Sequence, residues 1–294
     1  MKKCWVVENE KINSNNLEIL NEYLLDLKIA NRSEETIKSY RYYLERFLIH
    51  CSKNLQCLTF DDVYSWLQTF QGLEKSTIRK IMLVLSAFFN YCLDDDRKYI
   101  EKFLLKKCWW PKVPKSIPRY LETCELVRVK LEAESSSLRT RVMIELFNTT
   151  GCRLSEISSL NIDNLDLKNK SAKVLGKGKK RRTVYFTDAC ALLLKKYLEI
   201  HPKNTPALFY SQCSDRLSKD SMQKTVSSLG KSAKLSKKLT PHVFRHTFAK
   251  GQRDRGASLQ TVQGLLGHAN IRTTTIYTSV PLKSLVSVYR KLMG

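Results

Sequence analysis

Residues 240–249 read Thr240-Pro241-His242-Val243-Phe244-Arg245-His246-Thr247-Phe248-Ala249, and this stretch has the features of a helix start. Threonine is a favourable N-cap residue, and proline fits the first helical position because no backbone N–H is needed there. His242 and Arg245 are three residues apart, so their side chains point the same way. A helix N-terminus attracts anions. The segment therefore predicts a helix that presents an arginine to an anion, although a lone histidine here is more often structural than catalytic.

A second turn into a helix is predicted further upstream. Residues 150–157 read Thr150-Gly151-Cys152-Arg153-Leu154-Ser155-Glu156-Ile157. Gly151 allows the backbone to turn, and Arg153 and Glu156 share a helical face because they are three residues apart. Taken alone, this spacing describes a surface ion pair, which contributes little to stability.

A basic hairpin is predicted between these two segments. Residues 171–176 and 181–186 alternate like strands, and residues 177–180 form the turn that joins them. The run 168–182 has eight basic residues and no acidic one, and it lacks the GxxxxGK[ST] spacing of a nucleotide-binding loop. Such a run is often a solvated face or a non-specific phosphate binder. Lys177 stands out because it lies between two glycines, where the backbone can approach a ligand closely.

The last segment reads Leu265-Leu266-Gly267-His268-Ala269-Asn270-Ile271-Arg272-Thr273-Thr274-Thr275-Ile276-Tyr277-Thr278. Gly267 is typical of the residue that ends a helix, and a new helix start is expected near Asn270. Tyr277 is one of 13 tyrosines, so without its context it would be an ordinary half-buried aromatic residue.

The first hundred residues have helical patterns throughout. Leu17, Leu20, Tyr23, Leu24 and Leu27 have helical spacing, as do three further groups up to Cys92. Ser33 and Thr59, the latter with Asp62, are plausible N-caps, and Ser76 lies near the last helix start. These residues predict a four-helix module, preceded by a short tail.

A boundary follows at residues 106–119, which contain three prolines and five basic residues. Because proline lacks the backbone donor of a helix, we expect an extended, positively charged linker. It is either a simple tether or a segment that crosses a DNA backbone.

The charge points to a polyanionic partner. The 51 Lys and Arg residues exceed the 28 Asp and Glu residues by 23. Nucleic acid is the first candidate for that partner and an anionic membrane surface the second. The sequence offers neither an apolar run long enough to span a membrane nor a signal-peptide pattern, so we expect a cytoplasmic protein. The nine cysteines are odd in number and have no CxxC spacing, which argues against disulfides and structural zinc and favours reduced, mostly buried thiols.

Together, and in this order, the four segments resemble the catalytic boxes of the tyrosine recombinase, or phage integrase, family, and the similarity to its simpler Xer-type members extends over nearly the whole chain. The TGxRxSE, GKGxKxR, HxxRH and LLGHxxxxTTxxYT motifs are all matched. The matching residues are Thr150, Gly151, Arg153, Ser155 and Glu156; Gly176, Lys177, Gly178, Lys180 and Arg182; His242, Arg245 and His246; and Leu265, Leu266, Gly267, His268, Thr273, Thr274, Tyr277 and Thr278. No catalytic position departs from the family pattern, and Phe244, where leucine is frequent in the family, should matter only for packing.

The resemblance implies a strand-transfer mechanism without metal or ATP. Tyr277 would attack the scissile phosphate to form a 3′-phosphotyrosine, and Arg153 and Arg245 would bind the non-bridging oxygens. His268 would donate to the same phosphate, His242 would be an acid/base partner, and Lys177 would be the general acid. Glu156 would support this set without touching DNA, and further phosphate contacts would come from Lys179, Lys180, Arg181, Arg182, Lys112 and Lys115.

The resemblance also implies a mainly helical fold with a small sheet. We expect a tail (1–12), a helical, SAM-like core-binding domain (13–105), a linker (106–119), a mixed α/β DNA breaking-rejoining domain (120–280), and a tail for subunit exchange (281–294). No metal site, cofactor or separate arm-binding domain is expected.

The expected partner is double-stranded DNA with specific recombination sites, and the reaction is expected to pass through a Holliday junction. The protein would be a monomer or weak dimer in solution and a homotetramer on two DNA sites, associated with the nucleoid. Integration or resolution of a mobile element is favoured over chromosome dimer resolution only weakly. Three alternatives remain: a type IB-like topoisomerase, a non-catalytic DNA-binding protein on the same fold, and, on charge alone, a membrane-surface protein. A C-terminal tail that packs on its own domain is the alternative to subunit exchange.

Overall fold

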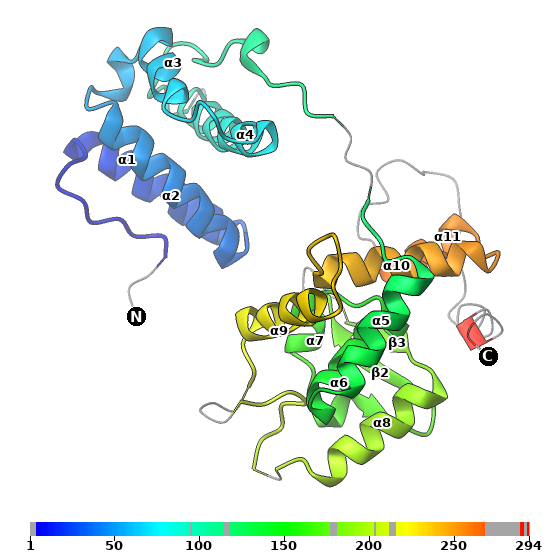
Figure 1. Ribbon diagram of the computed structural model, residues 1–294. Helices are drawn as coiled ribbons and strands as arrows, with labels where there is room; N and C mark the ends of the chain where they lie inside the picture. Colours follow the sequence, from blue (N-terminus) through cyan, green and yellow to red (C-terminus); the bar gives the residue numbers. More distant parts are fainter. Residues whose placement is uncertain are drawn as a thin grey trace. The chain divides into compact units, whose positions relative to one another are not determined.

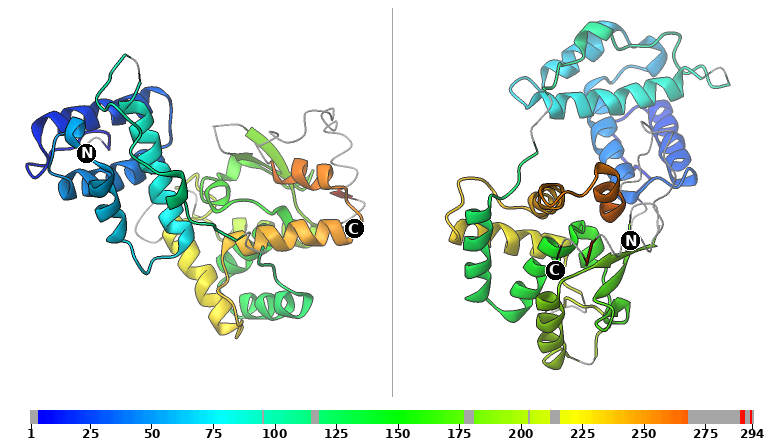
Figure 2. Two further views of the ribbon diagram at one scale, coloured as in Figure 1. Left: turned by 90° about the horizontal axis from the view of Figure 1, so that it is seen from above. Right: turned by 90° about the vertical axis from the view of Figure 1, so that its right-hand side faces the viewer.

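The computed structural model describes residues 4–94, 96–114, 118–176, 181–202, 204–211, 216–267, 289–290 and 293. The chain divides into two compact units, Met1–Ser116 and Ile117–Gly294 (Figures 1 and 2). Within the described residues, no helix is both long and apolar enough to cross a membrane.

The N-terminal unit has the four helices that the sequence predicts. These are α1 (Ser14–Ile29), α2 (Glu34–His50), α3 (Phe60–Gln68) and α4 (Lys75–Cys92), with a 3₁₀ turn, η1 (Leu55–Cys57), before α3. The Ser33 hydroxyl accepts a hydrogen bond from Thr36 N, and Thr59 and Asp62 form a capping box. Both predicted caps are therefore confirmed, and each satisfies N–H groups that the first helical turn leaves unpaired.

Aromatic side chains fill the core of this unit. The Phe47 ring meets the rings of Trp66 and Phe89 edge to face, with centroids 5.2 and 5.7 Å apart. The expected N-terminal tail is not free of this core, because Val7 and Ile12 are buried in it. The Val7 amide also donates to Asn21 Oδ1 at 2.7 Å, so two apolar residues and a hydrogen bond attach the first segment to α1.

The first part of the predicted linker also differs from an extended tether. Residues Lys107–Trp109 form a 3₁₀ turn, η2. Trp109 and Trp110 pack against the N-terminal core, and the Trp109 ring lies 6.3 Å from that of Phe60. Packing of these two aromatic side chains on the core stabilises the folded turn, and this stretch belongs to the N-terminal unit.

The C-terminal unit is mainly helical and has one small sheet (Figure 1). Its elements are α5 (Thr123–Glu134), α6 (Leu138–Thr150), α7 (Leu154–Ser158), η3 (Ile162–Asn164), β1 (Leu165–Asp166), β2 (Ser171–Leu175), β3 (Arg181–Tyr185), α8 (Asp188–Glu199), α9 (Lys219–Ser232), α10 (Pro241–Asp254) and α11 (Leu259–Leu266). The predicted fold class, helices with a small sheet, is confirmed.

Helix α6 is the centre of this unit. It packs against α5, α8 and α10, and α8 and α10 lie on opposite sides of it in Figure 1. The rings of Phe147 on α6 and Phe244 on α10 stack with centroids 6.0 Å apart. Phe244 therefore serves packing, which is the role expected for the residue that departs from the family pattern.

The sheet brings the basic segment next to α7. Strands β2 and β3 pair antiparallel with Val174 opposite Arg182, and β1 adds a two-residue edge that the sequence did not predict. Ala172 and Val174 of β2 and Val184 of β3 are buried, so one face of the hairpin packs on the core. The two predicted strands are confirmed, whereas the turn at residues 177–180 lies outside the described residues.

Candidate active site

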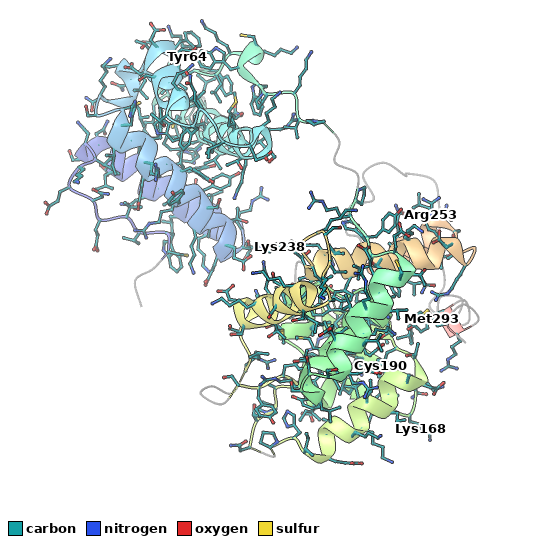
Figure 3. The ribbon with its side chains drawn as sticks, viewed as in Figure 1. Tyr64, Lys168, Cys190, Lys238, Arg253 and Met293 are labelled. Carbon is teal, nitrogen blue, oxygen red and sulfur yellow. The ribbon has the colours of Figure 1, made fainter. Side chains whose placement is uncertain are left out.

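The site is organised around the start of α10. The Thr240 hydroxyl accepts a hydrogen bond from Val243 N at 3.3 Å, and Pro241 occupies the first turn, as the sequence predicts. His242 is exposed in this turn, whereas Arg245 is 6% exposed. In Figure 3, Lys238 marks the approach to this helix and Arg253 lies near its other end.

Arg245 ties together two segments that are far apart in the sequence. Its Nη1 donates to Gly151 O at 2.8 Å, and its Nη2 donates to Leu266 O at 2.7 Å. Gly151 ends α6 with a φ of +60°, and a β-carbon there would lie 2.6 Å from the Phe248 ring, so glycine is required. Burial, followed by the positive charge of Arg153, lowers the pKa of the Arg245 guanidinium to about 10, which still leaves it charged at neutral pH.

Glu156 is the buried acceptor of the site, with no exposed surface. Its carboxylate accepts from Arg153 N at 2.8 Å and from Arg153 Nη1 at 3.0 Å. Burial alone would raise its pKa, but the hydrogen bond and charge of Arg182, followed by Arg153, outweigh burial and hold the pKa of Glu156 below its usual value. The pair of Arg153 and Glu156 is therefore no surface ion pair.

Arg182 lies elsewhere than the sequence suggested. We expected a phosphate contact, but its guanidinium donates to Glu156 Oε2 at 2.9 Å and to Leu265 O. The reason is the strand period of two residues, which places Arg182 on the same face as the buried Val184. That alternation is the sequence signal that would have identified Arg182 as inward-facing, whereas Arg181 is exposed.

Two guanidinium groups thus pair with one carboxylate, and a third, that of Arg245, interacts with it electrostatically. The charges of Arg153, Arg182 and Arg245 sum to +3 against −1 for Glu156, a net charge of about +2 in a partly buried place. Of the two arginines paired with Glu156, Arg153 is the more exposed: its side chain is 27% exposed and that of Arg182 is 15% exposed. A phosphate group would neutralise this charge and accept the planar donors of the arginines.

A second histidine joins this end of α10. His246 is one turn beyond His242, and burial followed by the charges of His242 and Arg245 lowers the pKa of His246. The sequence singled out His246 only as part of a motif. A neutral imidazole beside Arg245 can accept as well as donate a proton.

The remaining candidates are not all placed. Lys115, Lys177, Lys179, Lys180, His268 and Tyr277 lie outside the described residues. Lys112 is exposed at the end of the N-terminal unit. Gly267 ends α11 in a left-handed conformation with a φ of +61°, as predicted, and leads directly into His268.

Among the described residues, no three His, Cys, Asp or Glu side chains gather in a way that could hold a metal. Four of the eight described cysteines are buried, Cys4 is partly buried and three are exposed: the exposed ones are Cys57, Cys108 and Cys124. The expectation of mostly buried thiols therefore holds for only half of them. Cys190 of α8, labelled in Figure 3, is one of those in the core.

The described part of the C-terminal segment packs on its own unit. Tyr289 is 3% exposed, and its hydroxyl donates to Thr149 O at 2.9 Å. Its ring centroid lies 5.8 Å from that of Tyr185, and Met293 (Figure 3) contacts Gln252 of α10. In the single chain, these residues therefore pack on their own domain, which is the alternative to subunit exchange.

Comparison with known protein families assigns both units. The model of the phage integrase family matches residues 115–282, more than half of the chain, and the family's N-terminal SAM-like domain matches residues 19–98. The chain belongs to the phage integrase family. Its members are tyrosine recombinases, so this recombinase is a DNA strand-transferring enzyme, and the topoisomerase and non-catalytic alternatives are not favoured.

Relatives of this recombinase cover it almost end to end. Tyrosine recombinase XerC of Thermodesulfovibrio yellowstonii is 32% identical over 88% of this chain and 90% of its own length. Tyrosine recombinase XerA of Pyrococcus horikoshii is 31% identical over 94% of each.

Among solved structures, the XerH site-specific recombinase bound to its difH substrate in a pre-cleavage complex matches with a TM-score of 0.69 and 26% identity, over 97% of this chain and 91% of that one. A lambda integrase dimer bound to a core site has the same fold, with a TM-score of 0.71 at 18% identity over 90% of this chain and 98% of that one. Site-specific recombination is therefore the activity of the family to which this enzyme belongs.

Proposed function

We propose that this recombinase cleaves and rejoins duplex DNA at specific sites through Tyr277. The Tyr277 oxygen attacks the scissile phosphorus, a 3′-phosphotyrosine bond forms, and the bond to the 5′-oxygen breaks to leave a 5′-hydroxyl. Attack by a 5′-hydroxyl of another strand reverses these steps, so the bond energy is retained and no ATP is needed. The observation that carries this proposal is the buried carboxylate of Glu156, which pairs with Arg153 and Arg182 and interacts electrostatically with Arg245.

In this mechanism, Arg153 and Arg245 bind the non-bridging oxygens of the phosphate. Among the described residues, Arg153 uses one side-chain donor on Glu156, and Arg245 uses two on backbone carbonyls. A guanidinium has five N–H donors, so donors remain for the phosphate. The added charge of the transition state is stabilised most where fixed cations already face it.

The other roles concern proton transfer. His268 donates to the same phosphate, and His242, at the exposed start of α10, is the acid/base partner of Tyr277. Lys177 protonates the leaving 5′-oxygen. A substrate with a 5′-bridging sulfur needs no proton on leaving, so it should restore cleavage by Lys177→Ala, and failure of that rescue would remove lysine from this role.

Binding is expected to depend on phosphate contacts along the duplex. The excess of 23 positive charges supplies such contacts, and the solved relatives include recombinases bound to their DNA sites. Affinity should therefore fall steeply as salt rises. Lys112, Lys115, Lys179, Lys180 and Arg181 are the contacts that we propose.

We further propose a tetramer on two DNA sites, because two duplexes must be cut and exchanged through a Holliday junction. A lambda integrase tetramer bound to such a junction is among the structural neighbours at 19% identity. The C-terminal segment that holds Tyr289 on its own unit would then bind the equivalent surface of a neighbouring subunit.

The test uses nicked suicide duplexes, which lose a short fragment after cleavage so that religation fails. Wild type and Tyr277→Phe are incubated with such duplexes without metal or ATP and run on a denaturing gel. A covalent adduct on the 3′ side of the cut that is absent in Tyr277→Phe supports the proposal. An adduct that persists in Tyr277→Phe contradicts it, as does the lack of any adduct on DNA that the protein binds tightly.

A further inference from the structure

Arg182 joins three parts of the site through one side chain. It lies on β3, its Nη2 and Nε donate to Glu156 at 2.9 and 3.4 Å, and its Nη1 donates to Leu265 O at the end of α11. Glu156 in turn holds Arg153. One guanidinium thus connects the strand that follows Lys177, the helix that follows Arg153, and the helix that leads into His268.

The end of α11 is fitted to this side chain. Gly267 follows Leu266 with a φ of +61°, and a β-carbon built on Gly267 would lie 2.6 Å from Arg182 Cδ and 2.9 Å from Arg182 Nε. The backbone can approach the arginine this closely only because Gly267 has no side chain. The position of the chain just before His268 is therefore set against Arg182.

The geometry also argues against a role of Arg182 in DNA binding. Its Nε, Nη1 and Nη2 all donate to acceptors inside the protein, and the side chain is 15% exposed. By contrast, the neighbouring Arg181 is exposed. A residue whose donors face a buried carboxylate and a helix end acts on the site from within.

We propose that Arg182 is a positioning residue for strand cleavage, which fixes Glu156 and Arg153 relative to the end of α11. The inference rests on the proposed function, because Arg182 would support the cleavage reaction proposed above. A planar guanidinium is required, since a lysine keeps the charge but cannot reach a carboxylate and a carbonyl in two directions at once.

The experiment measures single-turnover cleavage of the suicide duplex over a series of protein concentrations, for wild type, Arg182→Ala and Arg182→Lys. Misplacement of reacting groups by a fraction of an ångström to an ångström lowers the rate by up to about 100-fold. For both variants we expect a cleavage rate at saturating protein that is about 10- to 100-fold lower than that of wild type. The protein concentration that gives half of the maximal rate, and its dependence on salt, should be unchanged.

Arg139→Ala is the matched control for loss of stability alone. Arg139 is also partly buried, and its Nη1 donates to Tyr210 O at 2.8 Å, away from the arginine cluster. It should lower the melting temperature without changing the saturated rate. Arg181→Ala is the control for a phosphate contact and should weaken binding and reduce the salt slope by about 1.

A pH profile separates positioning from a general structural role. The charged groups that face Glu156 are Arg153 of its own segment, Arg182 of β3 and, beyond them, Arg245 of α10, with the Cys152 thiol alongside. Without Arg182, the group that lowers the pKa of Glu156 most is lost, so Glu156 becomes easier to protonate. The cleavage rate of Arg182→Ala should therefore recover partly as pH rises, whereas that of Arg139→Ala should follow wild type.

The outcomes are distinct for the two proposals. If wild type forms no adduct, the proposed function fails. If wild type reacts and Arg182→Ala reacts at the same saturated rate, the positioning role alone is overturned. It is also overturned if Arg182→Lys restores the rate, or if Arg182→Ala changes only binding and its salt slope.

Discussion

At the scale of the residue, Arg153 and Arg245 share a charge but are held differently. Arg245 is almost fully buried and donates to the carbonyls of Gly151 and Leu266, so it supports the backbone at the ends of two helices. Arg153 is more exposed and is held by Glu156. A substitution at Arg153 should therefore report on phosphate binding with less disturbance of the fold.

Arg153→Lys should lower the saturated cleavage rate about 100-fold, because the planar donors that stabilise the transition state are lost while the charge remains. Quantitative single-turnover gels measure this rate. The matched control is Arg141→Lys, since Arg141 pairs with Glu134 on the exposed surface of the same unit. A rate within twofold of wild type for Arg153→Lys would remove Arg153 from the transition state.

Glu156→Gln should destabilise the C-terminal unit by about 3 kcal/mol at neutral pH, because two arginines lose their buried counter-charge. Since the pKa of Glu156 is lowered in the fold, its contribution is complete above the unfolded value of about 4.3 and is lost as pH falls through the lower folded value. Urea unfolding should show a constant difference between wild type and variant from about pH 5 upward and a smaller one below about pH 4. A difference that grows toward acid pH would contradict the assignment.

At the scale of the element, the end of α11 depends on a glycine with a second function. Gly267→Ala places a methyl group against Arg182, whereas Gly256→Ala, at a φ of +87°, meets nothing within 4 Å. Both changes should cost about 1 kcal/mol for the left-handed backbone. Only Gly267→Ala should also lower the saturated cleavage rate. Equal effects of the two variants on that rate would show that the contact between Gly267 and Arg182 does not matter for cleavage.

The sequence predicts helix N-caps and the pairing of neighbouring strands well. Ser33, Thr59 and Thr240 cap helices as predicted because each cap is a local hydrogen bond between residues three apart. The β2–β3 hairpin follows from alternation alone. These features need no knowledge of distant residues.

The sequence predicts features that depend on contacts between distant residues less well. The sequence predicts Arg182 as a phosphate contact and gives no sign of its partners, because Glu156 and Leu265 are 26 and 83 residues away along the chain. The packing of Val7 against α1, and of Trp109 near Phe60, was missed for the same reason. Composition marked both stretches as a tail and a linker, but burial of a few apolar side chains decided their structure.

At the scale of the whole molecule, the C-terminal segment can pack on its own unit or on a neighbouring subunit. In the single chain, Tyr289 is buried on its own unit among Phe248, Val262 and Leu266. If this surface accepts a neighbour's segment in the assembly, removal of the segment should leave site binding intact and prevent higher assembly.

A chain truncated after Pro281 should bind a single site but fail to form a tetramer on two sites, which sedimentation of the protein–DNA complexes can measure. Tyr289→Phe is the control, because it keeps the ring and loses only the hydrogen bond to Thr149 O, at a cost of about 1 kcal/mol. It should assemble as wild type does. Tetramers of normal stability from the truncated chain would refute subunit exchange.

The most direct measurement is the identity of the residue that carries the DNA. The trapped adduct is digested with protease and nuclease, and the modified peptide is sequenced by mass spectrometry. We expect a nucleotide joined through its 3′-phosphate to Tyr277. Attachment to any other of the 13 tyrosines, or to a serine or cysteine, would contradict it.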